Sequence, residues 1–323
     1  MSSPSSPMNA GRAMTRAEFL RLAAGAAVGL LVGGGAKAQA HAPGESSGGA
    51  MPTRPIPSTL EPLPVIGLGT YVGFDVPRDS EEYRRLPEVL RALFESGGAV
   101  IDTSPMYGRA EAVTGELLAA GGLRSRAFVA TKVWTRGRAE GIRQMQESMR
   151  LLQVERLDLM QVHNLVDWRV HLATLREWEA AGRVRYIGIT HYTQGAYGEL
   201  EAVMREAQFD FVQVNYSVDE REAERRILPL AAERGMAVLI NRPFGGGRVL
   251  RRLRDRPLPP WAMEIGATSW AQVLLKFVLS HPAVTCAIPG TGRPEHMADN
   301  VRAAIGTFPD AAFWQRHVDS IGA

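Results

Sequence analysis

An aspartate and a tyrosine stand five residues apart where a buried run of the sequence ends. The stretch VIDTSPMYG begins with apolar residues, reaches Asp102, breaks at Ser104-Pro105 and arrives at Tyr107. A carboxylate and a phenol at the end of a strand could take part in proton transfer, because a neighbouring charge tunes the acidity of a phenol. Two ordinary roles also fit, with Asp102 as a helix cap and Tyr107 as a half-buried loop aromatic.

A lysine at the end of a further apolar run weighs against those ordinary roles. The sequence has 34 arginines and only three lysines, Lys37, Lys132 and Lys276. Lys132 stands in VATKVW, where an arginine would serve equally well as a general cation. A compact ammonium can sit beside a phenol and shift its pKa, which a guanidinium cannot supply. We therefore interpret Lys132 as chosen for its chemistry. The alternative is that Lys132 stands at the edge of the fold by chance and extends its charged end into solvent.

Such residues need elements that bring the ends of several strands together. Eight apolar runs follow one another along the chain, over residues 63–71, 98–104, 127–134, 157–163, 183–190, 210–217, 236–243 and 283–290. Segments with helical periodicity separate them, which predicts a parallel sheet covered on both faces. Eight such units predict an α/β fold, a (β/α)8 TIM barrel of about 250 residues in a single domain. An open doubly wound sheet is the alternative, but the first strand leads into GLGTYVGF and lacks the Gly-rich dinucleotide turn.

In a TIM barrel the active site lies at the C-terminal ends of the strands. Polar and titratable residues occupy five of these expected ends. They are Asp102 and Tyr107, Lys132, His163 and Asn164, Thr190 and His191, and Gln213 and Tyr216, after the second to the sixth strand. The sequence thus places its chemistry where a barrel enzyme would use it.

The first forty residues differ from the rest. Three arginines precede a short apolar run rich in Gly and Ala, and the run ends in Ala38-Gln39-Ala40. This layout predicts a bacterial export signal over residues 1–40, removed by cleavage, so that no membrane span remains. A Pro-, Gly- and Ser-rich linker is expected over residues 41–62 and the barrel over residues 63–323.

The segment TRAEFLRLAAG resembles a twin-arginine export signal, with Ala17 where the second arginine belongs. The resemblance implies an export machinery that carries the folded protein to the periplasm. The alternative is a cytoplasmic protein whose leader is never used.

Charge and composition exclude several classes of partner. Without the leader the chain has 33 basic and 33 acidic residues, so it has no net charge and no basic footprint for nucleic acid. Cys286 is the single cysteine, which rules out an intrachain disulfide, and its apolar neighbours predict a small buried side chain. No cluster of His, Cys and carboxylate residues has metal-ligand spacing, so no metal is expected.

Six segments together resemble the aldo-keto reductase superfamily. They are IDTSPMYG, ATKVW, LMQVHN, YIGITHY, FVQVNYS and IPGTGRPEHMADN. The resemblance implies reduction of aldehydes or ketones with NADPH, or with NADH in some members, by a tetrad of Asp102, Tyr107, Lys132 and His163. Tyr107 would donate the proton, Lys132 would lower its pKa and Asp102 would hold Lys132 charged. His163 would help to polarise the carbonyl.

The resemblance also implies a nicotinamide site. Thr190, His191 and Gln213 match the residues that bind the carboxamide, although His191 stands where the family usually has Asn. Tyr216 is the candidate for a ring stacked on the nicotinamide. In the loop FGGGRVLRRLRDRP, Gly245 and Arg248 are expected at the diphosphate, because glycines let backbone N–H groups approach an anion. Three further arginines of this loop, Arg251, Arg252 and Arg254, fit a solvated basic turn.

The loop after the eighth strand departs from the family pattern. Gly290, Thr291 and His296 stand where the family often has Lys-Ser and then Arg for the 2′-phosphate of NADP. Both expected cations are therefore missing, and Arg242 or Arg293 is the expected substitute. We favour NADP over NAD. Asp299 and Asn300 match residues that contact the adenine.

Three aromatic residues after strand ends are expected to line the substrate pocket, namely Tyr71, Trp134 and Trp168. Four other tryptophans are expected to be packing residues, namely Trp178, Trp261, Trp270 and Trp314. The tail after the last barrel helix is short, which favours an open pocket for small carbonyl substrates. A regulatory or sensor protein that binds the cofactor with little turnover is the competing hypothesis. The intact tetrad favours the enzyme.

Overall fold

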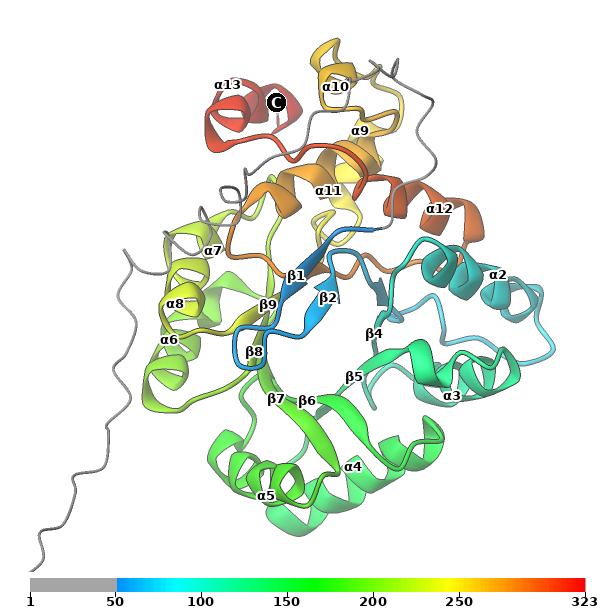
Figure 1. Cartoon of the computed structure of the whole chain (residues 1–323), viewed down its shortest axis with the longest axis vertical. Coiled ribbons are helices and arrows are strands. Elements are labelled where there is room, and N and C mark those ends of the chain that lie inside the picture. Colours follow the sequence, from blue (N-terminus) through cyan, green and yellow to red (C-terminus); the bar gives the residue numbers. More distant parts are fainter. Residues whose placement is uncertain (1–50, 323) are drawn as a thin grey trace, which may run out of the picture. The chain divides into compact units, whose positions relative to one another are not determined.

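The structure, a computed structural model, describes residues 51–322, so the predicted export signal lies outside the described residues. Its main sheet has eight parallel strands: β3 (Leu68–Gly69), β4 (Val100–Asp102), β5 (Phe128–Val133), β6 (Leu157–His163), β7 (Val184–Thr190), β8 (Phe211–Asn215), β9 (Ala237–Asn241) and β10 (Cys286–Ala287) (Figure 1). They neighbour one another in sequence order, and parallel bridges Ile66–Ala287 and Gly69–Gly290 join the two edges. The predicted (β/α)8 barrel is confirmed.

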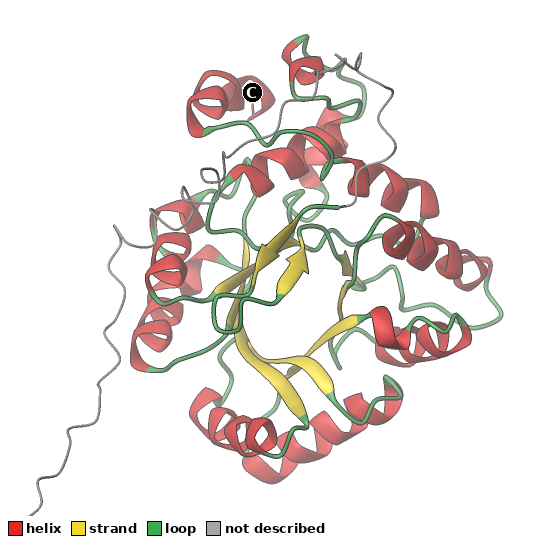
Figure 2. Cartoon of the chain, viewed as in Figure 1, coloured by secondary structure: helices red, strands yellow, loops and turns green. Residues whose placement is uncertain are grey.

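Helices surround the ring of strands (Figure 2). The longer ones are α2 (Glu81–Glu95), α3 (Ala110–Ala120), α4 (Arg138–Leu151), α5 (Trp168–Ala180), α6 (Tyr197–Glu206), α8 (Ile227–Glu233), α11 (Trp270–Ser280), α12 (Pro294–Arg302) and α13 (Ala311–Gly322). Short pieces lie between them: η1 (Arg124–Arg126), η2 (Gln194–Ala196), α7 (Glu222–Arg225), α9 (Arg248–Leu253) and α10 (Trp261–Glu264). Helix α11 begins with a serine cap, since Ser269 Oγ accepts the N–H of Gln272 at 3.1 Å.

Alternation along each strand separates an inner from an outer layer of side chains. Val100, Phe128, Leu159 and Phe211 belong to the inner cluster, together with the fully buried, unpaired Cys286. Residues one position later on the same strands, such as Ile101 and Val129, pack outward against the helices. Any residue an even number of positions after an inner one therefore points into the barrel, and this rule selects the side chains of the site.

The N-terminal hairpin differs from the expectation for this part of the chain. Strand β1 (Thr53–Pro55) pairs antiparallel with β2 (Pro62–Pro64), and in Figure 1 the hairpin lies across the ring of strands. Ile56 and Leu63 join the inner cluster. The expected linker over 41–62 thus contains a strand, and the predicted run 63–71 is split into β2 and β3. Three-residue strands beside prolines are too short for a sequence pattern to reveal.

Arg54 ties this hairpin to the far side of the barrel. Its guanidinium donates hydrogen bonds to the carbonyl oxygens of Leu279, His281 and Val284, at and after the end of α11. Burial lowers the pKa of this arginine.

Within residues 51–322, no helix has the length and apolar character needed to span a bilayer, and no group of three or more His, Cys, Asp or Glu side chains could hold a metal ion.

Candidate active site

A buried ion pair lies under the tyrosine at the C-terminal ends of β4 and β5. Lys132 Nζ donates to Asp102 Oδ2 at 2.7 Å and to the carbonyl oxygen of Thr103 at 2.8 Å. Lys132 is fully buried and Asp102 is 3% exposed. The ammonium lies 5.3 Å from the centre of the Tyr107 ring. Strand alternation explains this meeting, because Asp102 and Lys132 each follow an inner residue of their strand by an even number of positions.

The charges around Lys132 keep it an ammonium despite its burial. Burial alone disfavours the charged form, but the negative charge of Asp102 and its hydrogen bond to the ammonium outweigh this cost, so that the pKa of Lys132 is raised above its ordinary value. For Tyr107 the balance differs from the sequence expectation. Burial is the largest cause and raises the pKa of the phenol, while the positive charge of Lys132 acts in the opposite direction. Tyr107 therefore carries its proton at neutral pH.

His163 is held as a neutral imidazole. Burial, followed by the positive charge of Lys132 and the influence of His191, lowers its pKa to about 3. The ring is 6% exposed, and its Nδ1 is buried with no hydrogen-bond partner in the part of the chain that the structure describes. At neutral pH His163 can donate a hydrogen bond from one ring nitrogen but carries no charge.

Two glutamines hold the other oxygen of Asp102. The side-chain amides of Gln213 and Gln161 donate to Asp102 Oδ1 at 2.7 and 3.2 Å. The carbonyl oxygen of Gln213 accepts from Thr190 Oγ1 at 3.3 Å and from Asn241 Nδ2 at 3.4 Å. Gln213, expected at the nicotinamide carboxamide, is therefore already engaged with Asp102. Gln161 was not among the predicted site residues, although strand alternation from Leu159 to His163 places it inside the barrel.

A cavity of about 1130 Å³ opens over these strand ends. Tyr107, His163, Gln213 and Asp102 line it from the barrel, and three aromatic residues surround this end. We call Tyr71, Trp134 and Tyr192 the aromatic rim. The rings of Tyr71 and Tyr107 lie edge to face with centres 5.0 Å apart. Trp134 lies edge-on to His163 at 6.2 Å, and Tyr192 stacks on the same ring at 6.3 Å.

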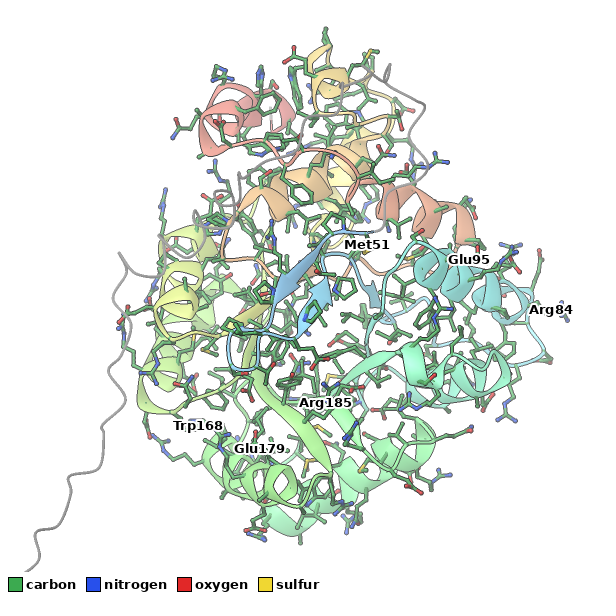
Figure 3. The ribbon with its side chains drawn as sticks, in the orientation of Figure 1. Met51, Arg84, Glu95, Trp168, Glu179 and Arg185 are labelled. Carbon is green, nitrogen blue, oxygen red and sulfur yellow. The ribbon has the colours of Figure 1, made fainter. Side chains whose placement is uncertain are left out.

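Tyr192 is a site residue that the sequence analysis quoted in YIGITHY without giving it a role. It is 42% exposed, stacks on His163 and lies 5.9 Å from the guanidinium carbon of Arg242. The expected residue Trp168 lies elsewhere. It packs against Phe209, with ring centres 6.3 Å apart, at the start of α5 (Figure 3). A tryptophan that begins a barrel helix faces the helical layer, and Trp168 does not line the cavity.

Tyr216 is also misplaced by the sequence expectation. It directly follows the inner residue Asn215, so it points outward, where its ring packs on Phe277 with centres 5.3 Å apart. Its hydroxyl donates to Glu224, and burial raises its pKa. Tyr216 cannot stack on a nicotinamide in the barrel, since it lies on the other face of its strand.

Thr190 and His191 do not line the cavity. Thr190 is buried, and its hydroxyl donates a hydrogen bond to the side chain of Gln213, which does line the cavity. Nδ1 of His191 accepts the backbone N–H groups of Tyr192 at 3.1 Å and Thr193 at 3.3 Å. The two residues therefore support Gln213 and the aromatic rim from behind.

The glycine turn after β9, Gly245–Gly247, differs in detail from the expectation. Gly245 is buried, whereas Gly246 and Gly247 line the cavity. Arg248 does not line it, because Nη2 of Arg248 pairs with Asp219 at 2.7 Å and Glu220 at 3.3 Å. Because these carboxylates are distant in sequence, no local pattern reveals that Arg248 is neutralised.

Two other arginines flank the glycine turn. A Cβ built on Gly246 would lie 3.1 Å from Nη2 of Arg242, and one on Gly247 would lie 3.1 Å from Nη1 of Arg251. Both glycines have positive φ, 65° and 82°, a conformation that other residues rarely adopt. Exposed backbone between two guanidinium groups suits an anionic diphosphate.

The far end of the cavity is lined by Trp270, His296, Asp299 and Asn300, and we call it the adenosine end. The expected residues Gly290 and Thr291 lie between it and the barrel. Asp299 accepts from Ser269 Oγ and from Gln272 Nε2, both at 2.6 Å. Trp270, expected to be a packing residue, lines the cavity with its indole N–H donated to the carbonyl of Arg256 at 2.8 Å. Trp178, Trp261 and Trp314 are buried as expected.

Buried polar atoms without partners show that this cavity suits a polar ligand. Among the described residues, Asn164 Oδ1, Asn241 Oδ1 and Arg242 Nε are buried and form no hydrogen bond, and all three residues line the cavity. Unpaired buried polar groups are costly, so they favour a ligand that can satisfy them. A nicotinamide dinucleotide, which has an amide, hydroxyls and a diphosphate, fits these residues.

Comparison with known proteins agrees with this geometry. The model of the aldo/keto reductase family matches residues 65–316. Methylglyoxal reductase YeaE of Escherichia coli is 32% identical over 74% of this chain and 84% of its own length. Aldo-keto reductase YhdN of Bacillus subtilis is 29% identical over 54% of this chain and 56% of its own length.

Solved structures resemble the barrel over most of its length. An aldo-keto reductase from Klebsiella pneumoniae in complex with NADPH has a TM-score of 0.69 and 26% identity, and the match covers 84% of this chain and 95% of that one. A further aldo/keto reductase structure from the same organism, with NADP and acetate, has a TM-score of 0.66 and 25% identity, over 81% and 92% of the two chains. The chain belongs to the aldo/keto reductase family and is an oxidoreductase that reduces aldehydes or ketones to alcohols.

Proposed function

We propose that this enzyme reduces small aldehydes and ketones with NADPH, and that Tyr107 supplies the proton. The observation that carries the proposal is the buried Asp102–Lys132 pair directly beneath a protonated tyrosine that faces the cavity. A structural tyrosine would have no need of a buried ammonium, which is costly to desolvate. The relatives solved with NADP or NADPH support the choice of cofactor.

The roles of the side chains follow from their charges and positions. When bound, the nicotinamide supplies a hydride to the carbonyl carbon. Tyr107 gives its proton to the carbonyl oxygen as negative charge develops there, and Lys132 stabilises the phenolate that remains. His163, being neutral, donates a hydrogen bond to the same oxygen. Asp102 keeps Lys132 charged and fixed in place.

The side chains of Gln161 and Gln213 hold Asp102, which in turn contacts Lys132. Both donate to Oδ1 of Asp102, which leaves Oδ2 facing the ammonium of Lys132. Charge-assisted hydrogen bonds of this kind fix a carboxylate firmly. We therefore assign the two glutamines as positioning residues for Asp102.

The substrate that fits best is small, uncharged and at least partly apolar. The aromatic rim presents three rings around Tyr107 and His163, and this end of the cavity is open enough to leave Tyr71 65% and Trp134 45% exposed. Apolar walls with a few converging polar groups are typical of small-molecule sites. The E. coli relative is named as a methylglyoxal reductase, so we include small oxoaldehydes in the proposed substrate class.

We also propose that the enzyme acts in the periplasm after export of the folded protein. The support is the leader-like pattern of residues 1–40, which ends in Ala38-Gln39-Ala40. Export after folding would let the barrel carry its cofactor across the membrane. Fractionation of the native host and N-terminal sequencing test this proposal. An intact N-terminus on protein from the cytoplasm would contradict it.

Turnover separates the reductase from a cofactor-binding sensor. The purified enzyme is mixed with NADPH and a panel of aldehydes that includes methylglyoxal and benzaldehyde, and loss of NADPH absorbance is followed. We expect multiple turnovers with several members of the panel. Tight NADPH binding with no turnover on any of them would reject the reductase and favour the sensor.

A further inference from the structure

The adenosine end lacks the cations that the family pattern places after the last strand. Gly290 and Thr291 carry no charge, and His296 interacts with Thr291, with 3.5 Å between Nδ1 and Oγ1. The two expected substitutes do not reach this end. Arg293 is exposed, pairs with Glu295 and does not line the cavity. Arg242 lies against Tyr192, which stacks on His163 near the barrel.

Helix α9 and the residue that follows it, Arg254, present two cations to the cavity from another wall. Leu250, Arg251, Leu253 and Arg254 line the cavity, whereas Arg252 does not. This spacing follows from helix geometry, because residues three and four apart share a face. The guanidinium of Arg251 lies against the glycine turn, and Arg254 stands one helical turn further along.

Contacts around the start of α11 connect Arg254 with the adenosine end. The indole N–H of Trp270 donates to the carbonyl of Arg256, two residues after Arg254, at 2.8 Å. Ser269, the residue before Trp270, donates to Asp299 at 2.6 Å. These contacts bring Trp270, Asp299 and the backbone beside Arg254 together, and Arg254, Trp270 and Asp299 all line the cavity. The partly buried Trp270 ring offers a flat apolar face for a purine.

The charge of these two arginines is uncompensated by protein. Within residues 51–322, the guanidinium groups of Arg251 and Arg254 form no ion pair or hydrogen bond, unlike those of Arg248 and Arg293. The nearby carboxylate of Asp299 accepts two hydrogen bonds at the start of α11. A guanidinium free on a cavity wall is suited to bind a phosphate group with two parallel hydrogen bonds.

We propose that Arg254 binds the 2′-phosphate of NADP and sets the preference for NADP over NAD, while Arg251 acts on the diphosphate that both cofactors share. This inference rests on the proposed function, since it names the cofactor of that same site. It transfers recognition of the 2′-phosphate from the loop after β10 to α9. Arg251 and Arg254 then have separate roles, and Arg252 lies outside the cavity.

The test measures binding rather than activity. Dissociation constants of NADPH, NADH, 2′,5′-ADP and ADP are determined by titration calorimetry for the wild type and for the variants Arg254→Gln, Arg251→Gln and Arg252→Gln. Loss of a charge-assisted hydrogen bond predicts about 10- to 100-fold weaker binding of NADPH and 2′,5′-ADP to Arg254→Gln, with NADH and ADP unchanged. Arg251→Gln should weaken NADPH, NADH and ADP, the three ligands that contain a diphosphate, by a similar factor. Arg252→Gln is the control for losing one charge nearby and should change none of them.

Several results would overturn the proposal. Equal weakening of NADPH and NADH by Arg254→Gln, or no weakening of either, would show that this arginine does not read the 2′-phosphate. If Arg252→Gln weakened NADPH binding as much as Arg254→Gln does, the contribution of Arg254 would be a non-specific attraction between positive charge and the phosphates. Failure of the proposed function is recognised separately: the wild type would then bind NADPH but turn over no aldehyde, whatever the arginine variants do.

Discussion

The two ends of the cavity are built in opposite ways. At the catalytic end, Asp102, Lys132, Gln161 and Gln213 are at most 3% exposed, and both oxygens of the carboxylate accept hydrogen bonds from protein donors. At the adenosine end, Arg254 stands exposed on a short helix without an ion pair in the part of the chain that the structure describes. One end is complete before any ligand arrives, whereas the other gains its counter-charge from the ligand.

The contrast reflects what each end must do. Catalysis by proton transfer needs charges whose positions do not change as the reaction proceeds, and a buried, hydrogen-bonded pair provides this. A charged cofactor must bind and also be released, so the electrostatic attraction that holds it should be weakened by water and salt. Exposed arginines provide such an attraction. The catalytic end should therefore respond strongly to single substitutions and weakly to salt, and the adenosine end should respond in the reverse way.

The largest effect is expected at the catalytic end, for Lys132→Met. Loss of the ammonium leaves Asp102 as a buried charge without its cation, so the free energy of unfolding should fall by about 3–5 kcal/mol. The same change should lower kcat by about a thousandfold, because Tyr107 loses the charge that stabilises its phenolate. Urea unfolding and steady-state kinetics measure the two effects.

Lys276→Met is the matched control for this substitution. Lys276 is also buried, but it donates to the carbonyls of Ile305 and Thr307, far from the chemistry. It should lose stability and keep kcat in the fraction that remains folded. If Lys132→Met likewise kept its kcat, the ammonium would be a structural group only.

A second effect concerns how stability depends on pH. The folded-state pKa of His163 is lowered from 6.5 to about 3, so the unfolded chain binds more protons in the window between these values. Stability should therefore rise with pH across that window, and at about pH 5 this residue should cost roughly 2 kcal/mol relative to neutral pH. His163→Gln should flatten the rise seen in urea unfolding, with His296→Gln at the exposed end as the control. An unchanged slope in His163→Gln would mean that the histidine is not held neutral by burial.

A smaller effect is expected for Gln161→Leu. The substitution removes one donor to Asp102 and keeps the other, so kcat should fall by about tenfold and stability by about 1–3 kcal/mol. If Gln161 acts by positioning Asp102, the pH profile of kcat should shift while the KM for NADPH stays constant. A loss of stability with kcat and its pH profile unchanged would make Gln161 a packing residue.

The smallest effect is that of salt on the two ends. Raising the ionic strength from about 0.05 to about 0.5 M shortens the screening length severalfold and should weaken NADPH binding several-fold. The value of kcat at saturating NADPH should change little, because the Asp102–Lys132 pair is buried. Titrations and steady-state assays over this range compare them. A kcat that fell in parallel with affinity would remove the distinction between the two ends.

The same contrast explains how much could be predicted from the sequence. Asp102, Lys132, His163 and Gln213 lie in the C-terminal parts of parallel strands with a regular apolar pattern, so the barrel rule alone brings them together. Tyr216 shows the limit of that rule, since a shift of one residue reverses the face of a strand.

The loops follow no comparable rule. The sequence favoured Arg248 for the cofactor and placed Arg254 in a solvated turn, and only the fold reveals that Asp219 and Glu220 neutralise Arg248. For the same reason, Trp168 was expected in the cavity but packs in the helical layer, and Trp270 was expected to pack but lines the cavity. The packing of a helix start depends on elements distant in the sequence. Strand periodicity therefore predicts the catalytic end, while the adenosine end depends on contacts between segments far apart in the sequence.

Tyr107→Phe tests the central claim most directly, because it removes the proton and leaves the ring in place. We expect kcat for aldehyde reduction to fall by about 10²- to 10⁴-fold, with the dissociation constant of NADPH unchanged. Tyr83→Phe is the matched control, since the Tyr83 hydroxyl donates to Glu116 and does not line the cavity, and it should keep kcat. A Tyr107→Phe enzyme that retained most of its kcat would contradict the assignment of Tyr107 as the proton donor.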